Sequence, residues 1–210
     1  MVRKVKEEAL ATKKAILKAA VDVFVEHGVA RSSLDMIAKK ANFTRGAVYW
    51  HFKNKVDIFE ALQDELHRPL IDMLLAKLEG DHPDPLDQLQ ESCIELLHDL
   101  ANIKERQDIL RIFFMRCDYA GEMEVLLKKQ EVQKKESLKL FAEFFERAKV
   151  KGHIPVYVNP DVLAVGLMCY LTGIATQYLR YPDTMNLDAQ APCMMKLFFN
   201  GVYESNREVG

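Results

Sequence analysis

The hydrophobic positions of this chain recur at helical spacing almost from end to end. No stretch alternates apolar and polar residues for long enough to predict a β-strand, so we expect an all-α protein. The first helix is predicted over residues 12–27, where Ile16, Ala20 and Phe24 recur at every fourth position. Gly28 follows at the place where the end of a helix favours a left-handed residue.

Two short helices are predicted next, separated by a turn. Ser32 and Ser33 lie where a hydroxyl can accept a hydrogen bond from a free amide of the first helical turn, and that helix ends near residue 41. Asn42 tolerates the left-handed conformation that a tight turn needs, and Thr44 can cap a helix that begins at Arg45. Two helices joined by a turn of about four residues form a helix-turn-helix.

The rest of the chain predicts a longer helical body. A helix from Lys55 to about residue 78 carries Pro69 in its interior, where the missing amide should bend it. Asp84 followed by Pro85 is typical of a helix start. Further helices are expected over residues 85–100, 105–117, 121–151, 159–180 and 188–204.

Charge divides the chain into two segments that its overall balance conceals. The 210 residues carry 29 basic and 31 acidic side chains, which give a formal net charge of -2. Residues 1–55 hold 12 Lys/Arg against 5 Asp/Glu, a net charge of +7, whereas residues 56–210 hold 17 against 26, a net charge of -9. A basic segment joined to an acidic body suggests a polyanion-binding domain beside a domain with another task. The alternative is a solvated, lysine-rich tail.

The start of the third predicted helix carries the chemistry of base recognition. In a major groove, an arginine can pair with guanine O6 and N7, and the methyl group of Thr or Ala can meet a thymine methyl. Nearby hydroxyl, phenol, imidazole and ammonium groups can hold phosphates. An aromatic cluster that merely packs together is the alternative for the three ring-bearing residues 49–51. The predicted DNA-binding residues are Ser32, Ser33, Thr44, Arg45, Gly46, Ala47, Tyr49, Trp50, His51 and Lys55.

Residues 33–38 and 44–55 together closely resemble the DNA-binding domain of TetR-type transcriptional regulators, and the run from Tyr49 to Lys55 is the most specific part. Asn42 and Phe43 stand where the family usually has Gly and Val, which bears on turn geometry and core packing. The resemblance implies a DNA-binding domain at residues 1–55 and a helical effector-binding and dimerisation domain at residues 56–210. It also implies that the helix containing Pro69 relays effector binding, which makes Pro69 a candidate hinge; a purely structural bend is the alternative.

Shorter stretches resemble the AcrR branch of this family, whose members repress multidrug efflux pumps. They are residues 3–9, residues 116–123 and the spacing of Gly166, Met168, Tyr170 and Gly173. The branch implies a ligand cavity lined by the kinked helix and its neighbours. For each candidate ligand residue, ordinary core packing is the alternative. The candidates are Gln63, His67, Phe113, Phe114, Cys117, Gln130, Met168 and Gln177.

The segment from Val162 to Leu179 contains no charged residue, although Thr172, Thr176 and Gln177 interrupt it. We therefore expect a helix that is buried on several sides rather than a transmembrane span. With the last helix, it can form half of a four-helix interface with a second copy, which matches the family's dimer. Two-fold symmetry then predicts a palindromic operator with half-sites about 34–36 Å apart, or at a multiple of that spacing.

These features predict a cytoplasmic, homodimeric transcriptional repressor that binds operator DNA and releases it when a small apolar effector binds, with a multidrug efflux operon as the expected target. A ligand-responsive activator, or a regulator of a non-efflux metabolic operon, is the alternative. An enzyme is not expected, because the sequence has no G-x-S-x-G, Walker, G-x-G-x-x-G or H-E-x-x-H motif. The four cysteines are far apart, so we predict no metal site, disulfide framework or cofactor.

Overall fold

The computed structural model describes the backbone of residues 2–204 and the side chains of residues 6–203. Every regular element in this part of the chain is a helix, so the predicted all-α fold is confirmed. The chain divides into two compact units. The first unit comprises the residues up to Leu66 and Asp108–Lys129, and the second comprises His67–Gln107 and the residues from Gln130 onward. The expected domain division at residue 55 stays a prediction.

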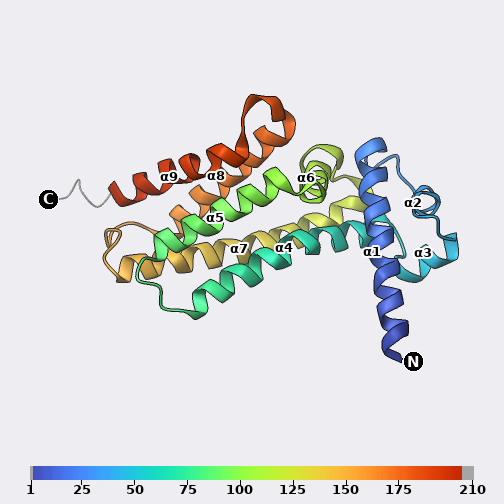
Figure 1. Ribbon diagram of the computed structural model, residues 1–210, viewed down its shortest axis with the longest axis horizontal. Helices are drawn as coiled ribbons and strands as arrows, with labels where there is room; N and C mark the ends of the chain where they lie inside the picture. The colour runs from blue at the N-terminus through green and yellow to red at the C-terminus, as the bar shows by residue number, and fades with distance from the viewer. Residues whose placement is uncertain (1, 205–210) are drawn as a thin grey trace. The chain divides into compact units, whose positions relative to one another are not determined.

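The first unit begins with three helices, α1 (Val2–His27), α2 (Leu34–Ala41) and α3 (Arg45–His51), and α2 packs against both of the others (Figure 1). Asn42 ends α2 with a φ of 55°, in the left-handed region. The predicted helix-turn-helix is therefore confirmed. The first helix starts ten residues before its expected beginning, because residues 2–11 are rich in Lys, Glu and Ala, which favour helix without needing burial. The side chains of Arg3, Lys4 and Val5, which contribute to the AcrR resemblance, lie outside the described ones.

One apolar core holds the first unit together. The predicted stripe of Ile16, Ala20 and Phe24 on α1 is fully buried, and α4 (Lys55–Glu79) adds Phe59 and Leu62 to the same core. Removing such side chains from water is the main force that orders α2 and α3, since these two helices are too short to be stable alone.

A π-helical turn interrupts the segment that the sequence predicts as one helix over residues 105–117. The structure has α6 (Lys104–Arg111), then the π turn η1 (Ile112–Arg116), and the next helix opens with a 3-10 turn, η2 (Gly121–Glu124), before α7 (Val125–Val150). Phe113 packs its ring 4.7 Å from that of Phe59, and the Tyr119 hydroxyl donates to the Phe113 carbonyl at 3.2 Å. These contacts stabilise the wider turn, which apolar spacing alone does not encode.

The second unit contains α5 (Pro85–Asn102), α8 (Pro160–Arg180), the 3-10 turn η3 (Pro182–Thr184), α9 (Leu187–Glu204) and most of α7. Within it, α5 packs extensively against α9 and also contacts α8. Its core contains Phe141, Phe144, Phe145 and Phe199, of which Phe145 and Phe199 stack with ring centroids 6.5 Å apart. The predicted helix starts at Asp84 and Asn159 are confirmed as capping residues.

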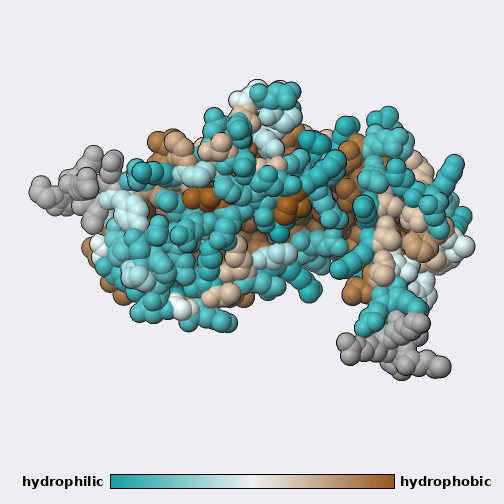
Figure 2. Space-filling view, viewed as in Figure 1, coloured by the Kyte–Doolittle hydropathy of each residue, from teal (hydrophilic) through white to brown (hydrophobic). Residues whose placement is uncertain are grey.

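Helix α8 leaves much of its apolar surface uncovered within the single chain. Val162 and Val165 are exposed, as is Leu197 on α9, whereas most of the face in Figure 2 is hydrophilic. Among the described helices, α8 alone is long and apolar enough to cross a membrane, although only 28% of its most apolar 18-residue window is buried. The apolar helix predicted to need burial on several sides is therefore covered by its own chain over only part of its surface.

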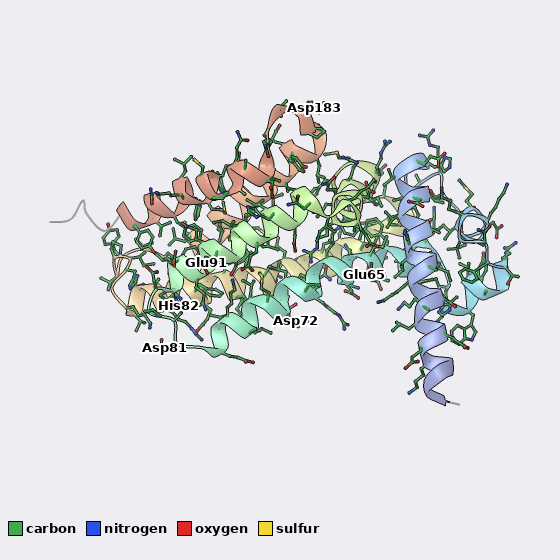
Figure 3. The ribbon with its side chains drawn as sticks, viewed as in Figure 1. Glu65, Asp72, Asp81, His82, Glu91 and Asp183 are labelled. Atoms are coloured by element: carbon green, nitrogen blue, oxygen red, sulfur yellow. The ribbon has the colours of Figure 1, made fainter. Side chains whose placement is uncertain are left out.

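The turn between α4 and α5 ends in a carboxylate that joins three parts of the second unit. Asp81 and His82 lie in this turn (Figure 3), and His82 accepts a hydrogen bond through Nδ1 from the Asp84 amide at 3.1 Å. Asp84 Oδ1 caps α5 by accepting from two backbone amides, and its Oδ2 accepts from the Tyr203 hydroxyl at 2.8 Å. His153 Nδ1 lies 3.3 Å from the same carboxylate. One side chain therefore links the start of α5, the end of α9 and the α7–α8 connection.

Candidate nucleic-acid interface

The outer face of α3 presents a polar and aromatic surface because its inner face is fixed by packing. Val48 and Phe52, four residues apart, are buried. Helical spacing then turns Arg45 and Tyr49 outward, and both are exposed. Thr44 caps the helix by accepting a hydrogen bond from the Ala47 amide at 3.2 Å, which fixes where the helix begins.

Arg45 is held over the helix rather than extended into solvent. Its Nη2 donates to the Tyr49 hydroxyl at 3.3 Å, and its guanidinium carbon lies 5.1 Å from the centre of the Tyr49 ring. Its Nε lies 3.1 Å from Asp35 Oδ1 on α2. The hydrogen bond to Tyr49 and the charge of Asp35 raise the pKa of Arg45 above the ordinary value for arginine. The arginine is therefore ordered and fully charged at the start of the helix.

Trp50 and His51 form an edge-to-face pair with ring centroids 4.5 Å apart. Trp50 is nevertheless 74% exposed, so its ring is mostly available to a partner molecule. Burial and the nearby charge of Lys13 lower the pKa of His51. Trp50 and His51 therefore do pack against each other, as the aromatic-cluster alternative expects, but most of the Trp50 side chain remains exposed.

The remaining predicted DNA-binding residues differ in how far their side chains are exposed and in whether their polar groups are already hydrogen-bonded within the chain. Ser33 is exposed and caps α2 by accepting from the Met36 amide at 3.2 Å. Gly46 is exposed and Ala47 is half-buried. Ser32, by contrast, is buried and donates its hydroxyl hydrogen to the Gly28 carbonyl at 2.6 Å. Lys55 donates a hydrogen bond to the Val29 carbonyl and forms an ion pair with Glu122. The part of each residue in DNA binding stays a prediction.

The predicted ligand residues fall into both compact units. In the first, Gln63 is 4% exposed and its Oε1 has no hydrogen-bond partner among the described residues. Phe113 and Cys117 are half-buried against the core of that unit, and Phe114 is exposed. Burial, followed by the charge of Asp118, raises the pKa of Cys117 to about 11, so its thiol stays protonated and unreactive at neutral pH.

In the second unit, His67 is a ligand candidate with several polar neighbours. Its Nε2 lies 3.1 Å from the Gln133 carbonyl oxygen, 3.3 Å from the Ser137 hydroxyl and 3.8 Å from a Glu136 carboxylate oxygen. Gln130 and Met168 are half-buried, and Gln177 is exposed. None of these contacts identifies a ligand, so the eight ligand residues stay predictions.

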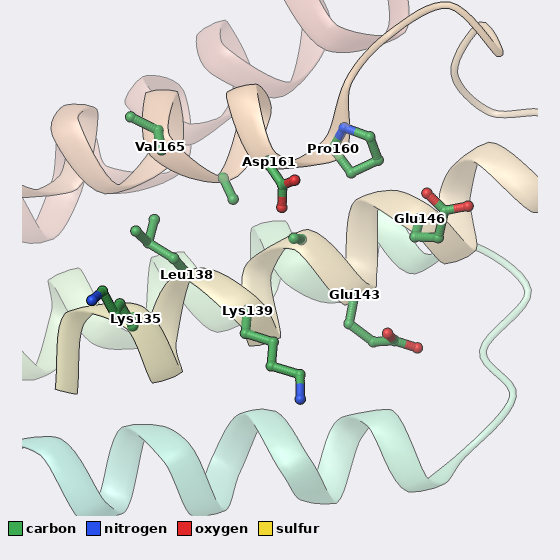
Figure 4. Close-up of a pocket in the computed structure, with 10 residues that line it drawn as sticks. Lys135, Leu138, Lys139, Glu143, Glu146, Pro160, Asp161 and Val165 are labelled. Carbon is green, nitrogen blue, oxygen red and sulfur yellow. The ribbon is translucent and has the colours of Figure 1, made fainter. Parts of the chain in front are cut away.

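A groove between α7 and α8 is lined by residues that sequence reasoning missed (Figure 4). Its volume is about 440 Å³, and it is open to solvent. Leu138 and Val165 supply apolar surface, and Lys139, Glu143 and Asp161 supply charge. Because these residues belong to two helices that are separate in sequence, only their packing brings them together. No group of three or more His, Cys, Asp or Glu among the described residues is arranged to hold a metal ion.

The geometry defines a class of protein, a helix-turn-helix DNA-binding regulator with a separate helical region. Comparison with known proteins gives the family. Residues 16–62 match "Bacterial regulatory proteins, tetR family", and residues 84–202 match "MAATS-type transcriptional repressor, C-terminal region". The second match covers more than half of the chain, so the protein belongs to the TetR family of transcriptional regulators. The predicted family is confirmed.

Several relatives carry names that refer to repression. The chain is 33% identical over 178 residues to the HTH-type transcriptional repressor BepR of Brucella suis biovar 1, which covers 85% of each chain. It is 32% identical to the HTH-type transcriptional regulator AcrR of Shigella flexneri, covering 91% of this chain and 89% of AcrR. The protein is accordingly a DNA-binding transcriptional regulator of a group that includes repressors.

Two similar solved structures are efflux-pump repressors. NalD, described as the secondary repressor of the MexAB-OprM multidrug efflux pump in Pseudomonas aeruginosa, matches with a TM-score of 0.81 and 28% identity, over 93% of this chain and 98% of NalD. SmeT in complex with triclosan matches with a TM-score of 0.82 and 28% identity, over 91% of each chain. SmeT is the repressor of the Stenotrophomonas maltophilia multidrug efflux pump SmeDEF.

Proposed function

We propose that the protein is a cytoplasmic homodimeric repressor that binds a palindromic operator and releases it when a small apolar or drug-like molecule binds. We further propose that its target is a multidrug efflux operon. The names of its relatives support the target, since AcrR is similar over 91% of this chain and NalD and SmeT repress efflux pumps.

The observation that carries this proposal is the exposed face of α3. Thr44, Arg45, Gly46 and Ala47 form the start of a helix whose opposite side is buried, so this end is free to enter a major groove. Arg45 supplies a guanine-reading group, and Tyr49 orders it through a hydrogen bond. Ser33, Trp50 and His51 would then flank the bases and contact the backbone.

Charge supports the same assignment. The net charge of +7 in residues 1–55 favours phosphate binding, because neutralising phosphates releases condensed counterions. Operator affinity should therefore fall steeply as salt rises. The net charge of -9 in residues 56–210 repels DNA and favours approach by the basic segment.

The uncovered apolar surfaces of α8 and α9 support a homodimer. Val162, Val165 and Leu197 would be costly to leave in water, and a second copy placed on the same surfaces would cover them. The same burial accounts for an apolar helix in a protein that we place in the cytoplasm rather than in a membrane.

For effector release, we propose that a ligand prefers a body conformation in which the two DNA-binding segments are wrongly spaced. A coupling free energy of roughly 1–3 kcal/mol would weaken operator binding by about 5–150-fold. Pro69 is the proposed hinge, because it removes one backbone hydrogen bond from the interior of α4. The candidate effector residues remain the eight named above, with Gln63 supported by its unpaired buried oxygen.

The test of the DNA-binding surface is a fluorescence-anisotropy titration with duplexes from the promoter region beside the gene. Arg45→Ala and Tyr49→Ala should each weaken operator binding by roughly 1–3 kcal/mol while the protein stays a folded dimer. Lys134→Ala, which removes an exposed cation from α7 in the other unit and outside α8 and α9, is the control and should leave affinity unchanged. If all three variants bind the operator as tightly as the wild type, the exposed face of α3 is not the surface that recognises the bases.

Effector release is tested in the same titration with triclosan as the probe, since SmeT binds it. We expect operator affinity to fall when triclosan is added and the DNA-free protein to melt at a higher temperature. Deleting the gene in a strain that carries a promoter reporter distinguishes a repressor from an activator. Promoter activity rises on deletion if the protein is a repressor, and it falls if the protein is an activator.

A further inference from the structure

The ammonium group of Lys55 has three oxygen partners within the chain. Its Nζ lies 3.1 Å from the Val29 carbonyl oxygen, 3.4 Å from the Ala30 carbonyl oxygen and 3.1 Å from Glu122 Oε1. A lysine ammonium has three N–H donors. Two of these contacts are hydrogen bonds to backbone carbonyls and the third is an ion pair with Glu122, so a phosphate that binds the remaining side of Lys55 must displace the Glu122 carboxylate.

The three acceptors of Lys55 are not equally replaceable. Val29 and Ala30 follow α1, and the Val29 amide donates to the Arg116 carbonyl at 3.1 Å, so this backbone is fixed from two sides. Glu122 lies in the short turn η2, and its side chain is 56% exposed, whereas that of Lys55 is 16% exposed. The carboxylate of Glu122 is therefore the acceptor that faces solvent and can be exchanged.

We propose that Glu122 is a positioning residue for DNA binding that acts through Lys55 by competing with a DNA phosphate for its ammonium group. This inference rests on the proposed DNA-binding function and goes beyond it. A carboxylate and a phosphate are both anionic acceptors for the same N–H group. While Glu122 holds Lys55, the lysine is already neutralised, so a phosphate that replaces Glu122 gains less than it would from a free lysine.

The competition changes how binding depends on salt. Each phosphate neutralised by a free cation contributes about 0.9 to the slope of log affinity against log salt. In the wild type, the freed Glu122 carboxylate reclaims a counterion, which offsets that contribution. Replacing Glu122 by glutamine keeps the size of the side chain and removes the charge, so the full contribution of Lys55 should return.

The experiment measures binding of the full-length protein to two duplexes, promoter DNA and an unrelated sequence, over a range of salt concentrations. Glu122→Gln should tighten binding to both about 1.4–5-fold, the range expected from an exposed ion pair, and steepen the salt slope by up to about 0.9. Glu124→Gln removes the same charge from the same turn and is the matched control. It should change affinity less and leave the slope near the wild-type value.

A double-mutant cycle tests whether Glu122 acts through Lys55. In a Lys55→Met background, Glu122→Gln should give no gain in affinity. If Lys55→Met does not fold, Lys55→Arg serves instead, because five guanidinium donors can serve both anions and the gain from Glu122→Gln should shrink. A gain that persists in the lysine variant, or that Glu124→Gln reproduces in full, would overturn the proposal.

The two duplexes separate this proposal from the proposed function. Phosphate contacts are independent of sequence, so the Glu122→Gln gain should appear on both duplexes. Loss of binding by Arg45→Ala should appear on promoter DNA alone, since that residue reads bases. If Arg45→Ala binds promoter DNA as tightly as the wild type, the proposed base-reading role of α3 is rejected. If Glu122→Gln and the wild type bind the unrelated duplex equally tightly, the proposed role of Glu122 is rejected.

Discussion

The Tyr203 hydroxyl donates a hydrogen bond to Asp84 Oδ2 at 2.8 Å, joining the end of α9 to the first turn of α5. The two residues are 119 positions apart in sequence. Burial and this hydrogen bond raise the pKa of Tyr203, so the hydroxyl keeps its proton and its role as donor at all physiological pH values. The contact stabilises the last helix against α5, its main packing neighbour.

Replacing Tyr203 by phenylalanine should therefore destabilise the protein. The ring stays in place, and the loss is one hydrogen bond to a charged acceptor, about 1–2 kcal/mol for this half-buried site. The measurement is the free energy of unfolding from urea titration. Tyr181→Phe removes an exposed hydroxyl as the control, and a loss of equal size in both variants would show that the Asp84 contact contributes nothing specific.

Stability should fall in acid partly through Asp84. Burial raises the pKa of this carboxyl, but hydrogen bonds from the Asp87 and Leu86 amides and from Tyr203, with the charge of His153, outweigh burial and hold the pKa below the ordinary value of 3.8. A carboxyl whose folded pKa is depressed adds stability above its unfolded pKa. That stability is lost as pH falls through the folded value.

Asp84→Asn isolates this effect, because asparagine keeps the capping function and cannot titrate. The variant should be less stable than the wild type at pH 6, and this difference in stability should narrow as pH falls below the ordinary carboxyl pKa of 3.8. Urea midpoints over this pH range measure it, with Asp72→Asn, on the exposed side of α4, as the control. A gap that stays constant over the whole range would contradict the prediction.

Asn42 should tolerate glycine and reject a β-branched residue. Its φ of 55° is favourable for Gly and Asn, whereas a branched side chain pays about 1–2 kcal/mol there. Asn42→Gly should leave thermal stability nearly unchanged, and Asn42→Val should lower it and weaken operator binding because the turn sets α3 against α2. Equal melting temperatures for the two variants would show that the turn relaxes without cost.

Leu197→Asp should dissociate the proposed dimer. The residue is 67% exposed on α9 in the single chain, so a charge there costs little in the monomer but is unpaired at an apolar interface. Sedimentation should give a species near the chain mass of 24.1 kDa. Val132→Asp on α7 is the control, since it is 65% exposed and lies outside the last two helices; a monomeric wild type, or dissociation by both variants, would reject the interface.

The sequence predicts local features of the fold well, because their causes lie within a few residues. Asn42, Thr44 and Asp84 are identified as turn and capping residues from their side chains and the helices that follow, and the structure confirms each of them. The inner stripe of α1 follows from helical spacing in the same way. Exposure of Arg45 follows from the inward position of Val48 on the same short helix.

Features that depend on distant partners were not predictable. Lys55 forms an ion pair with Glu122, which is 67 positions away in sequence. The residues around Lys55 give no sign of this partner, so the sequence predicts a lysine that is free to bind a phosphate. Ser32 is buried, and this burial depends on packing that the residues around it in the sequence do not reveal. The groove between α7 and α8 likewise has no signature in either helix, because its lining is shared between the two.

The π turn at Ile112–Arg116 has a consequence for how this chain tolerates insertions and deletions. A π turn holds more residues than the α-helical turn that it replaces. Losing one residue there would close an ordinary α-helical turn, but it would rotate the chain beyond it by about 100° relative to the helix before it. The Arg116 carbonyl would then no longer meet the Val29 amide. We therefore expect sequence length in this stretch to be preserved more strictly than the identity of its apolar side chains.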